Sequence, residues 1–415
     1  MSLAYDVSAP ILNAGMARVD RPAETLAAYA LAWGLTSILA AALSQIRQVG
    51  LVLADSRHNK RKVELFVLGC GSCMALVLAM LALTPAGTWL IDEVHGVDPP
   101  LGTLVRQALF WLIPIPILQG LSRLYSGLLL RLRRSEILGY ATLASIGISI
   151  ATVLLLLPTR FVQVQPIRLP ILVTYASVLV DLSVIFWGYR RFGRPLLEKM
   201  ADTKLSFSYV ARFFWPLAMV MAIQGLSRPL INLFVSRGEN GAEALAVLAV
   251  VYAVAHVPYG WLNELKNLSA AFKNDDHNLY HIRRFIGGCG LLSFTTMALI
   301  FWTPAKQPIL ERWIGLEGHL ADLCGPPLIL FSFFPIAVAL RSHLHGVALV
   351  EHRTRSLAPS GPCRIATIAI VMLALPASVM HGATRGITAL LSGFIVETLV
   401  VWWGVRRKNS ARYTL

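Results

Sequence analysis

Long apolar segments limit the folds open to this chain more than any other feature of its sequence. A helix needs roughly 17 residues to cross the hydrocarbon core of a bilayer. Eleven segments exceed that length, at residues 26–46, 63–84, 105–130, 137–158, 169–189, 208–235, 243–265, 284–303, 323–348, 358–379 and 382–404. Residues 1–17 form a twelfth, shorter apolar piece without a basic start or clear cleavage site, so no signal peptide is expected there. The pattern predicts an all-α integral membrane protein with about 12 transmembrane helices.

The basic residues are distributed unevenly among the loops between these segments. The net charge is +15. Segments rich in Lys and Arg alternate with poor ones such as 84–103, which has neither; the rich segments include 55–62, 131–134, 190–199 and 406–412. Such an excess marks cytoplasmic loops. We therefore expect a multi-pass protein of the cell (plasma or inner) membrane with both termini cytoplasmic. Anionic headgroups of the lipid bilayer, and no nucleic acid, are the expected partners of the basic loops.

The chain contains an internal repeat with an offset of 219 residues. Residues 8–47 and 227–266 align without gaps at 10 identities in 40, among them Ser8/Ser227, Pro10/Pro229, Asn13/Asn232 and Arg18/Arg237. If each half crosses the membrane six times, the two halves have the same orientation. They are then related by an axis along the membrane normal. The predicted domains are a six-helix lobe over 1–190 with a short first helix, a cytoplasmic linker over 191–207, a second lobe over 208–405 and a basic tail over 406–415.

An arginine at membrane depth is the most informative single residue. Arg228 lies within the apolar segment 213–236 and directly precedes Pro229, which predicts a kink or break in the helix. Helical spacing brings Gln224, Arg228 and Asn232 close to one face, and Ser227 is adjacent. Charged groups inside a membrane usually face a bundle interior or a water-filled path. The alternative is a structural arginine satisfied by helix-end carbonyls or a buried carboxylate.

Other polar residues also fall within the predicted spans. Arg123 follows Gln119 by four residues and shares its face, and Arg341 is followed by two histidines, His343 and His345. Residues 256–259 place His256, Pro258 and Tyr259 in a polar segment interrupted by proline, with Pro229 and Pro258 as predicted hinges. The carboxylates at comparable depth are candidates for coupling or ion pairing; they are Asp6, Asp181, Glu264 and Glu397.

These groups favour a transporter for anions. The planar guanidinium fork suits carboxylate or phosphate, whereas a cation transporter should place acidic groups at its centre. The predicted substrate-binding residues are Arg228, Gln224, Ser227, Asn232, Arg341, Arg123, Gln119, Asn13, His256 and Tyr259. The sequence contains no phosphate-binding loop of the Walker type and no paired metal-ligand spacing. We therefore expect no enzyme activity, cofactor or metal, and a monomer that runs on a gradient to move a small anionic substrate.

Several segments closely resemble the progressive ankylosis protein family. They are residues 213–237, 252–272 and 327–344, with weaker likeness at 27–33 and 48–57, and the resemblance covers essentially the whole chain. It implies the fold of multidrug and toxin extrusion (MATE) transporters of the MOP superfamily, with two pseudo-symmetric six-helix lobes in a V shape. It also implies export of pyrophosphate, ATP or citrate. Two departures are the short first helix and Asp181, where a basic residue would be expected.

Three other functions are consistent with the same features. A flippase for a lipid-linked pyrophosphate precursor would also need a cationic cavity. A multidrug exporter would share the fold but would call for carboxylates at the centre. A non-transporting membrane regulator would have every arginine paired with a carboxylate.

Overall fold

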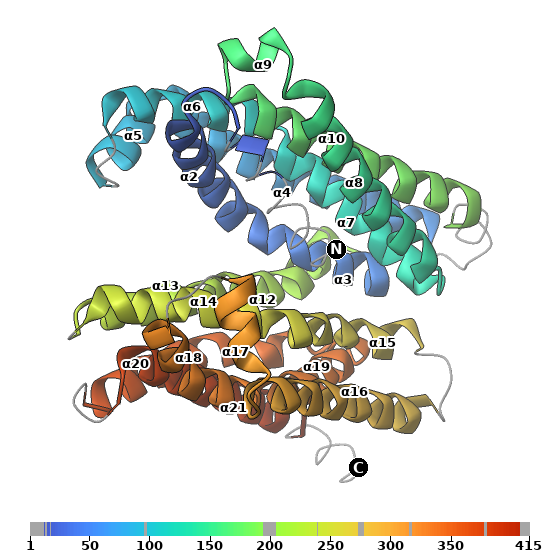
Figure 1. Cartoon of the computed structure of the whole chain (residues 1–415). Helices are drawn as coiled ribbons and strands as arrows, with labels where there is room; N and C mark the ends of the chain where they lie inside the picture. The colour runs from blue at the N-terminus through green and yellow to red at the C-terminus, as the bar shows by residue number, and fades with distance from the viewer. Residues whose placement is uncertain are drawn as a thin grey trace, which may run out of the picture. The chain divides into compact units, whose positions relative to one another are not determined.

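The computed structural model is built from helices. It describes residue 12, residues 15–16 and the ranges 18–94, 98–193, 205–238, 240–272, 278–314, 318–376 and 380–406, and every regular element in these ranges is helical. The chain divides into two compact units, Met1–Phe214 and Trp215–Leu415. In Figure 1 the first unit runs from blue to green and the second from yellow to red.

The first long helix described in the first unit changes to 3-10 winding at residues 42–45. The elements are α2 (Pro22–Ala41), the 3-10 segment η1 (Ala42–Gln45), α3 (Ile46–Leu53), α4 (Arg57–Leu83), α5 (Pro85–Thr88), the π-helical η2 (Trp89–Val94), α6 (Pro99–Leu112), α7 (Ile115–Arg131), α8 (Ser135–Leu156), α9 (Arg160–Val164), α10 (Arg168–Gly188) and η3 (Tyr189–Gly193).

The second unit has a similar order of elements. After α12 (Phe207–Gly225), which contains the boundary, follow α13 (Ser227–Ser236), α14 (Gly241–Tyr259), the 3-10 segment η4 (Gly260–Leu265), α15 (Lys266–Ala271), α16 (Asn278–Phe301), α17 (Lys306–Pro308), the π-helical η5 (Ile309–Trp313), α18 (Gly318–Phe331), α19 (Phe334–Val350), η6 (Thr354–Leu357), α20 (Ser360–Ala374) and α21 (Gly382–Arg406).

The apolar segments of the sequence became the long helices of the structure. Ten helices in the described residues are long and apolar enough to cross a membrane, and the pair α6 and α7, bent by 41°, makes an eleventh span. All eleven predicted spans have a counterpart among these, which confirms the predicted fold class. Most of the predicted first helix lies outside the described residues.

The 219-residue offset extends through the helix boundaries of the two units. The starts of α2 and α14, both ends of α6 and α18, and both ends of α7 and α19 are each separated by 219 positions. The described non-glycine residues with positive φ obey the same offset: Arg21 pairs with Asn240, and Arg133 with His352. An unusual backbone conformation that recurs in register is strong evidence of a duplicated fold, because few non-glycine residues adopt it.

A close helix contact also repeats at this offset. A Cβ atom added to Gly127 in α7 would lie 2.2 Å from the carbonyl oxygen of Arg47 in α3. A Cβ atom added to Gly346 in α19 would lie 2.8 Å from the carbonyl oxygen of Lys266 in α15. Gly346 and Lys266 are the 219-offset counterparts of Gly127 and Arg47. Small residues allow membrane helices to approach this closely.

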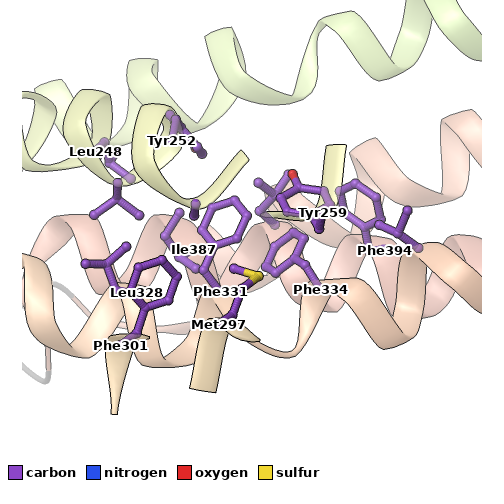
Figure 2. Close-up of a cluster of buried hydrophobic side chains, with 14 of the residues drawn as sticks. Leu248, Tyr252, Tyr259, Met297, Phe301, Leu328, Phe331, Phe334, Ile387 and Phe394 are labelled. Atoms are coloured by element: carbon purple, nitrogen blue, oxygen red, sulfur yellow. The ribbon is translucent and has the colours of Figure 1, made fainter. Parts of the chain in front are cut away.

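Aromatic side chains form much of the core of the second unit. Figure 2 shows part of this cluster, in which α14, α16, α18, α19 and α21 all contribute side chains. The rings of Phe331 and Phe334 stack at a centroid distance of 4.1 Å, and Phe334 meets Phe394 edge-on at 5.1 Å. Phe394 in α21 therefore joins this core to the polar residues around Glu397 on the same helix.

The division between the two compact units falls inside α12. The cytoplasmic linker over the segment 191–207 stays a prediction. Residues 194–204 of that segment lie outside the described residues. The first turns of α12 belong to the first unit because Phe214 packs edge-on against Phe66 at 5.4 Å. Lys62 also donates to the carbonyl of Leu205, just before α12, at 2.5 Å.

We expect Gly127→Ala and Gly346→Ala each to destabilise the protein. An added methyl group must push α7 from α3, or α19 from α15, and such overpacking costs about 1–3 kcal/mol. The unfolding temperature of each purified variant in detergent should fall.

Gly139→Ala in α8 and Gly287→Ala in α16 are matched controls. A Cβ atom at either position meets nothing within 4 Å, so these variants should be neutral or slightly more stable, since alanine favours helix. Equal behaviour of the two sets would contradict the close-contact account.

Candidate functional site

A fully buried carboxylate lies at the centre of the candidate site. Glu397 is in α21, in the middle of the apolar span Gly382–Arg406, and its exposed fraction is 0%. An isolated carboxylate is strongly disfavoured in such surroundings unless it is paired and hydrogen-bonded. The partners of Glu397 therefore define the chemistry of this region.

Two arginines share this carboxylate. Arg341 in α19 donates from Nη1 to both Glu397 oxygens at 3.3 Å. Arg364 in α20 donates from Nη1 to Oε2 at 3.1 Å. Both guanidinium groups are buried. Two positive charges against one negative charge leave this cluster with a formal excess of +1.

Two amide side chains complete the shell. Gln224, near the end of α12, donates from Nε2 to Glu397 Oε1 at 2.5 Å. Asn263 accepts a hydrogen bond from Arg341 Nη2 at 2.5 Å. Asn263 belongs to η4, where the change from α to 3-10 winding alters which side chains face the bundle. Residues of five helical elements thus form this cluster.

An aromatic ring supports both cations. Phe394 is three residues before Glu397 on α21 and therefore lies on a similar face of the helix. Its ring centroid is 4.8 Å from the guanidinium carbon of Arg341 and 4.0 Å from that of Arg364. Cation–π attraction strengthens when the cation is removed from water, so Phe394 offsets part of the cost of burying two arginines.

Arg228 adds a third cation to this unit. It lies in α13, is exposed, and its guanidinium carbon is 4.5 Å from the ring centroid of Tyr252. Within the described part of the chain Arg228 makes no ion pair. Tyr252 interacts electrostatically with Arg228 and Arg364, and Tyr259 with these two and Arg341. The three cations therefore lie near two tyrosines, and two of the cations share the Glu397 carboxylate.

The helix interruption near Arg228 is earlier than predicted. The break was expected at Arg228 and Pro229, but α12 ends at Gly225 and α13 begins at Ser227. Pro229 lies in the first turn of α13, where backbone N–H groups have no partner within the helix. The missing N–H of proline therefore costs no helical hydrogen bond there. Gln224 and Arg228 consequently belong to different helices, and the expectation of one shared face is wrong: Gln224 reaches Glu397 while Arg228 lies over Tyr252.

The other predicted residues of the second unit surround this cluster to differing degrees. Ser227 is buried, and its hydroxyl has no hydrogen-bond partner in the described residues, whereas Asn232 is exposed on α13. His256 meets Tyr259 edge-on at 5.3 Å, and Pro258 immediately precedes the end of α14. Glu264 in η4 is exposed and accepts from Asn267 at 2.9 Å.

The histidines after Arg341 lie on the same helix, α19. His345 is half-buried and interacts electrostatically with Arg341, Glu397 and Lys266. His343 is half-buried and interacts with Arg283 instead. The structure therefore places His345, and not His343, beside the shared carboxylate.

The first unit has its own acidic residue at a related position. Asp181 in α10 accepts from the hydroxyl of Ser122 at 2.5 Å and interacts electrostatically with Arg123. Ser122 is the 219-offset counterpart of Arg341. In both units, therefore, the same repeat position donates a hydrogen bond to an acidic residue. In the first unit α7 donates to α10, and in the second α19 donates to α21. Gln119, also in α7, is half-buried; Asp6 and Asn13 lie outside the described residues.

Sequence reasoning missed two members of the cluster, Arg364 and Asn263. Arg364 falls inside the predicted span 358–379, so its charge within an apolar segment was the available signal. Asn263 falls near the end of the span 243–265, where a polar residue is unremarkable without knowledge of the 3-10 turn.

The model of the family described as "Progressive ankylosis protein (ANKH)" matches residues 1–303. The chain belongs to the progressive ankylosis protein family. Its long apolar helices also make it a multi-pass membrane protein.

Solved structures of MATE transporters have the same fold. A point mutant of the Vibrio cholerae MATE transporter VcmN matches with a TM-score of 0.72 at 12% identity over 99% of this chain and 94% of that one. An outward-facing multidrug resistance MATE transporter of the MOP superfamily matches with a TM-score of 0.69 at 11% identity over 100% and 96%. A MOP superfamily transporter from Pyrococcus furiosus, described as having a binding pocket of reverse polarity, matches with a TM-score of 0.64 at 12% identity over 100% and 96%.

We expect Glu397→Ala to be strongly destabilising. It leaves two buried guanidinium groups without their carboxylate, and breaking a buried pair in this way costs about 3–5 kcal/mol. Thermal unfolding of the purified variant in detergent measures the loss. Glu311→Ala, which truncates an exposed glutamate of η5 in the same unit, should change stability by less than about 1 kcal/mol. A Glu397→Ala variant as stable as this control would contradict the central position of the carboxylate.

Proposed function

We propose that this protein is a secondary-active transporter that exports small polyanions of the citrate, pyrophosphate or nucleotide class by alternating access. The observation that supports this most is the excess of positive charge in the second unit. Arg341 and Arg364 share Glu397, and Arg228 has no ion pair among the described residues. Membership of the progressive ankylosis protein family and the MATE-type fold support transport as the activity.

The chemistry of the cluster suits a substrate with more than one anionic group. Guanidinium groups bind carboxylate and phosphate through paired N–H donors. In this proposal Arg341 and Arg364 hold one anionic group and Arg228 holds another. Gln224, Ser227 and Asn232 orient the substrate by hydrogen bonds, and Tyr259 and His256 border the same region. In the first unit, Arg123 with Gln119 forms a separate candidate group beside Asp181.

Two prolines mark where the helices of the second unit could bend. Pro229 follows the interruption between α12 and α13, and Pro258 precedes the change to 3-10 winding in η4. Hinges of this kind absorb backbone changes when a transporter alternates between states. We further propose that the protein is a monomer in the cell membrane with both termini cytoplasmic, as the distribution of Lys and Arg favours.

Multidrug export is the main competing function, because two of the matching structures are described as multidrug resistance transporters. An organic cation would require carboxylates free to receive it, whereas Glu397 already carries two arginines and a glutamine. The Pyrococcus furiosus transporter, described as having a binding pocket of reverse polarity that suggests a different function, is a precedent for a changed pocket polarity on this fold.

Polyanions should stabilise the purified protein against heat, and drug cations should not. A ligand at 100 times its dissociation constant adds about 2.7 kcal/mol of stability. A thermal-shift screen against citrate, pyrophosphate, nucleotides and ethidium measures this directly. Stabilisation by ethidium with no response to any polyanion would favour multidrug export instead.

Arg228→Ala should lower transport of labelled citrate or pyrophosphate in proteoliposomes at least about tenfold, because it removes a charge-assisted contact to the substrate. Its thermal stability should stay close to that of the wild type, since the side chain is exposed. Arg237→Ala is the matched control: Arg237 is an exposed arginine directly after α13. Transport by Arg228→Ala at the control's level would remove Arg228 from the substrate path.

A further inference from the structure

Glu397 accepts hydrogen bonds from only part of the guanidinium group of each buried arginine. Arg341 approaches the carboxylate through a single nitrogen, Nη1, and Arg364 likewise through its own Nη1. A guanidinium normally takes a carboxylate or phosphate with two parallel N–H donors. One carboxylate cannot offer such a two-point contact to both arginines at once. The pairing observed is therefore weaker, for each cation, than the pairing an added anion could supply.

One donor of Arg364 is left without a partner altogether. Its Nε is buried and makes no hydrogen bond within the described residues. Arg364 itself is only 6% exposed. A buried donor that lacks an acceptor costs roughly 1–3 kcal/mol, so the arrangement is poised to accept an anionic oxygen on that edge of the guanidinium.

The carboxylate is also connected to the interrupted helix pair. Gln224, which donates to Glu397 Oε1, is the last residue but one of α12, directly before the break that leads to α13. Arg228 is the second residue of α13, just beyond that break. Any change in the hydrogen-bond partners of Glu397 therefore affects the end of α12 as well as the two arginines.

We propose that Glu397 is an internal counter-anion that holds the place of a substrate carboxylate or phosphate on Arg341 and Arg364, and that the arriving substrate displaces it from Arg364. This role rests on the proposed polyanion transport and deepens it. Arg364 then binds the substrate group through Nε and Nη, while Glu397 remains on Arg341, which also contacts the substrate group. Glu397 returns to Arg364 when the substrate leaves, and so prevents a highly charged substrate from being held too tightly to be released.

The charge of the cluster provides a graded test. Four forms of the full-length protein in nanodiscs are compared for binding of inorganic pyrophosphate, with citrate in parallel: wild type, Glu397→Gln, Arg364→Gln and the double variant with both changes. Removing the competing carboxylate should tighten binding by Glu397→Gln about tenfold, whereas Arg364→Gln should weaken binding by about tenfold or more. The double variant should bind at least about tenfold more tightly than Arg364→Gln alone, because Arg341 is then free of its competitor.

Transport by the same proteins separates this role from a merely structural one. Glu397→Gln should bind tightly yet exchange labelled pyrophosphate at a tenth of the wild-type rate or less, since release becomes limiting. A carboxylate that only supports the fold would lose binding and exchange together.

The double variant keeps the test decisive if Glu397→Gln does not fold, because it restores the charge balance of the wild type. Binding by either Glu397 variant that is no tighter than that of its parent, with the wild type binding normally, would overturn the counter-anion role alone. Failure of the wild type and every variant to bind any polyanion would overturn this role and the proposed function together.

Discussion

The pairing of one buried carboxylate with two arginines organises the second unit. Glu397 has no exposed surface, so its charge depends on partners within the described residues, chiefly Arg341, Arg364 and the Gln224 amide. Buried ion pairs contribute little net stability compared with apolar packing, but removing one partner is costly. A network of this kind is therefore better explained by what its charge can do than by the stability it adds.

The duplication shows how such a site can arise. Helices α7 and α19 begin and end 219 positions apart, and the glycines that admit α3 and α15 recur at that offset. At two aligned repeat positions, the first unit has Ser122 and Arg123 where the second unit has Arg341 and Ser342. Moving a guanidinium by one residue turns it by about 100° around the helix. The second unit consequently directs an arginine at its acidic residue where the first unit offers a serine hydroxyl.

Hydropathy located the long spans found in the described residues because each apolar segment had to become a helix in order to satisfy its own backbone in lipid. The repeat was visible in the sequence because Pro, Asn and Arg recur in register. The pairing of Arg341 with Glu397 was not predictable, since it joins residues 56 positions apart on different helices. Arg364 was not predicted as a site residue, although it lies in an apolar span. The helix break lies at Gly225, before the position that Pro229 predicts.

An experimental structure of the full-length protein with pyrophosphate bound tests the central claim most directly. The account predicts density for the anion in hydrogen-bond contact with at least two of the guanidinium groups of Arg228, Arg341 and Arg364. Pyrophosphate bound elsewhere in the chain, with all three arginines keeping their present contacts, would contradict it.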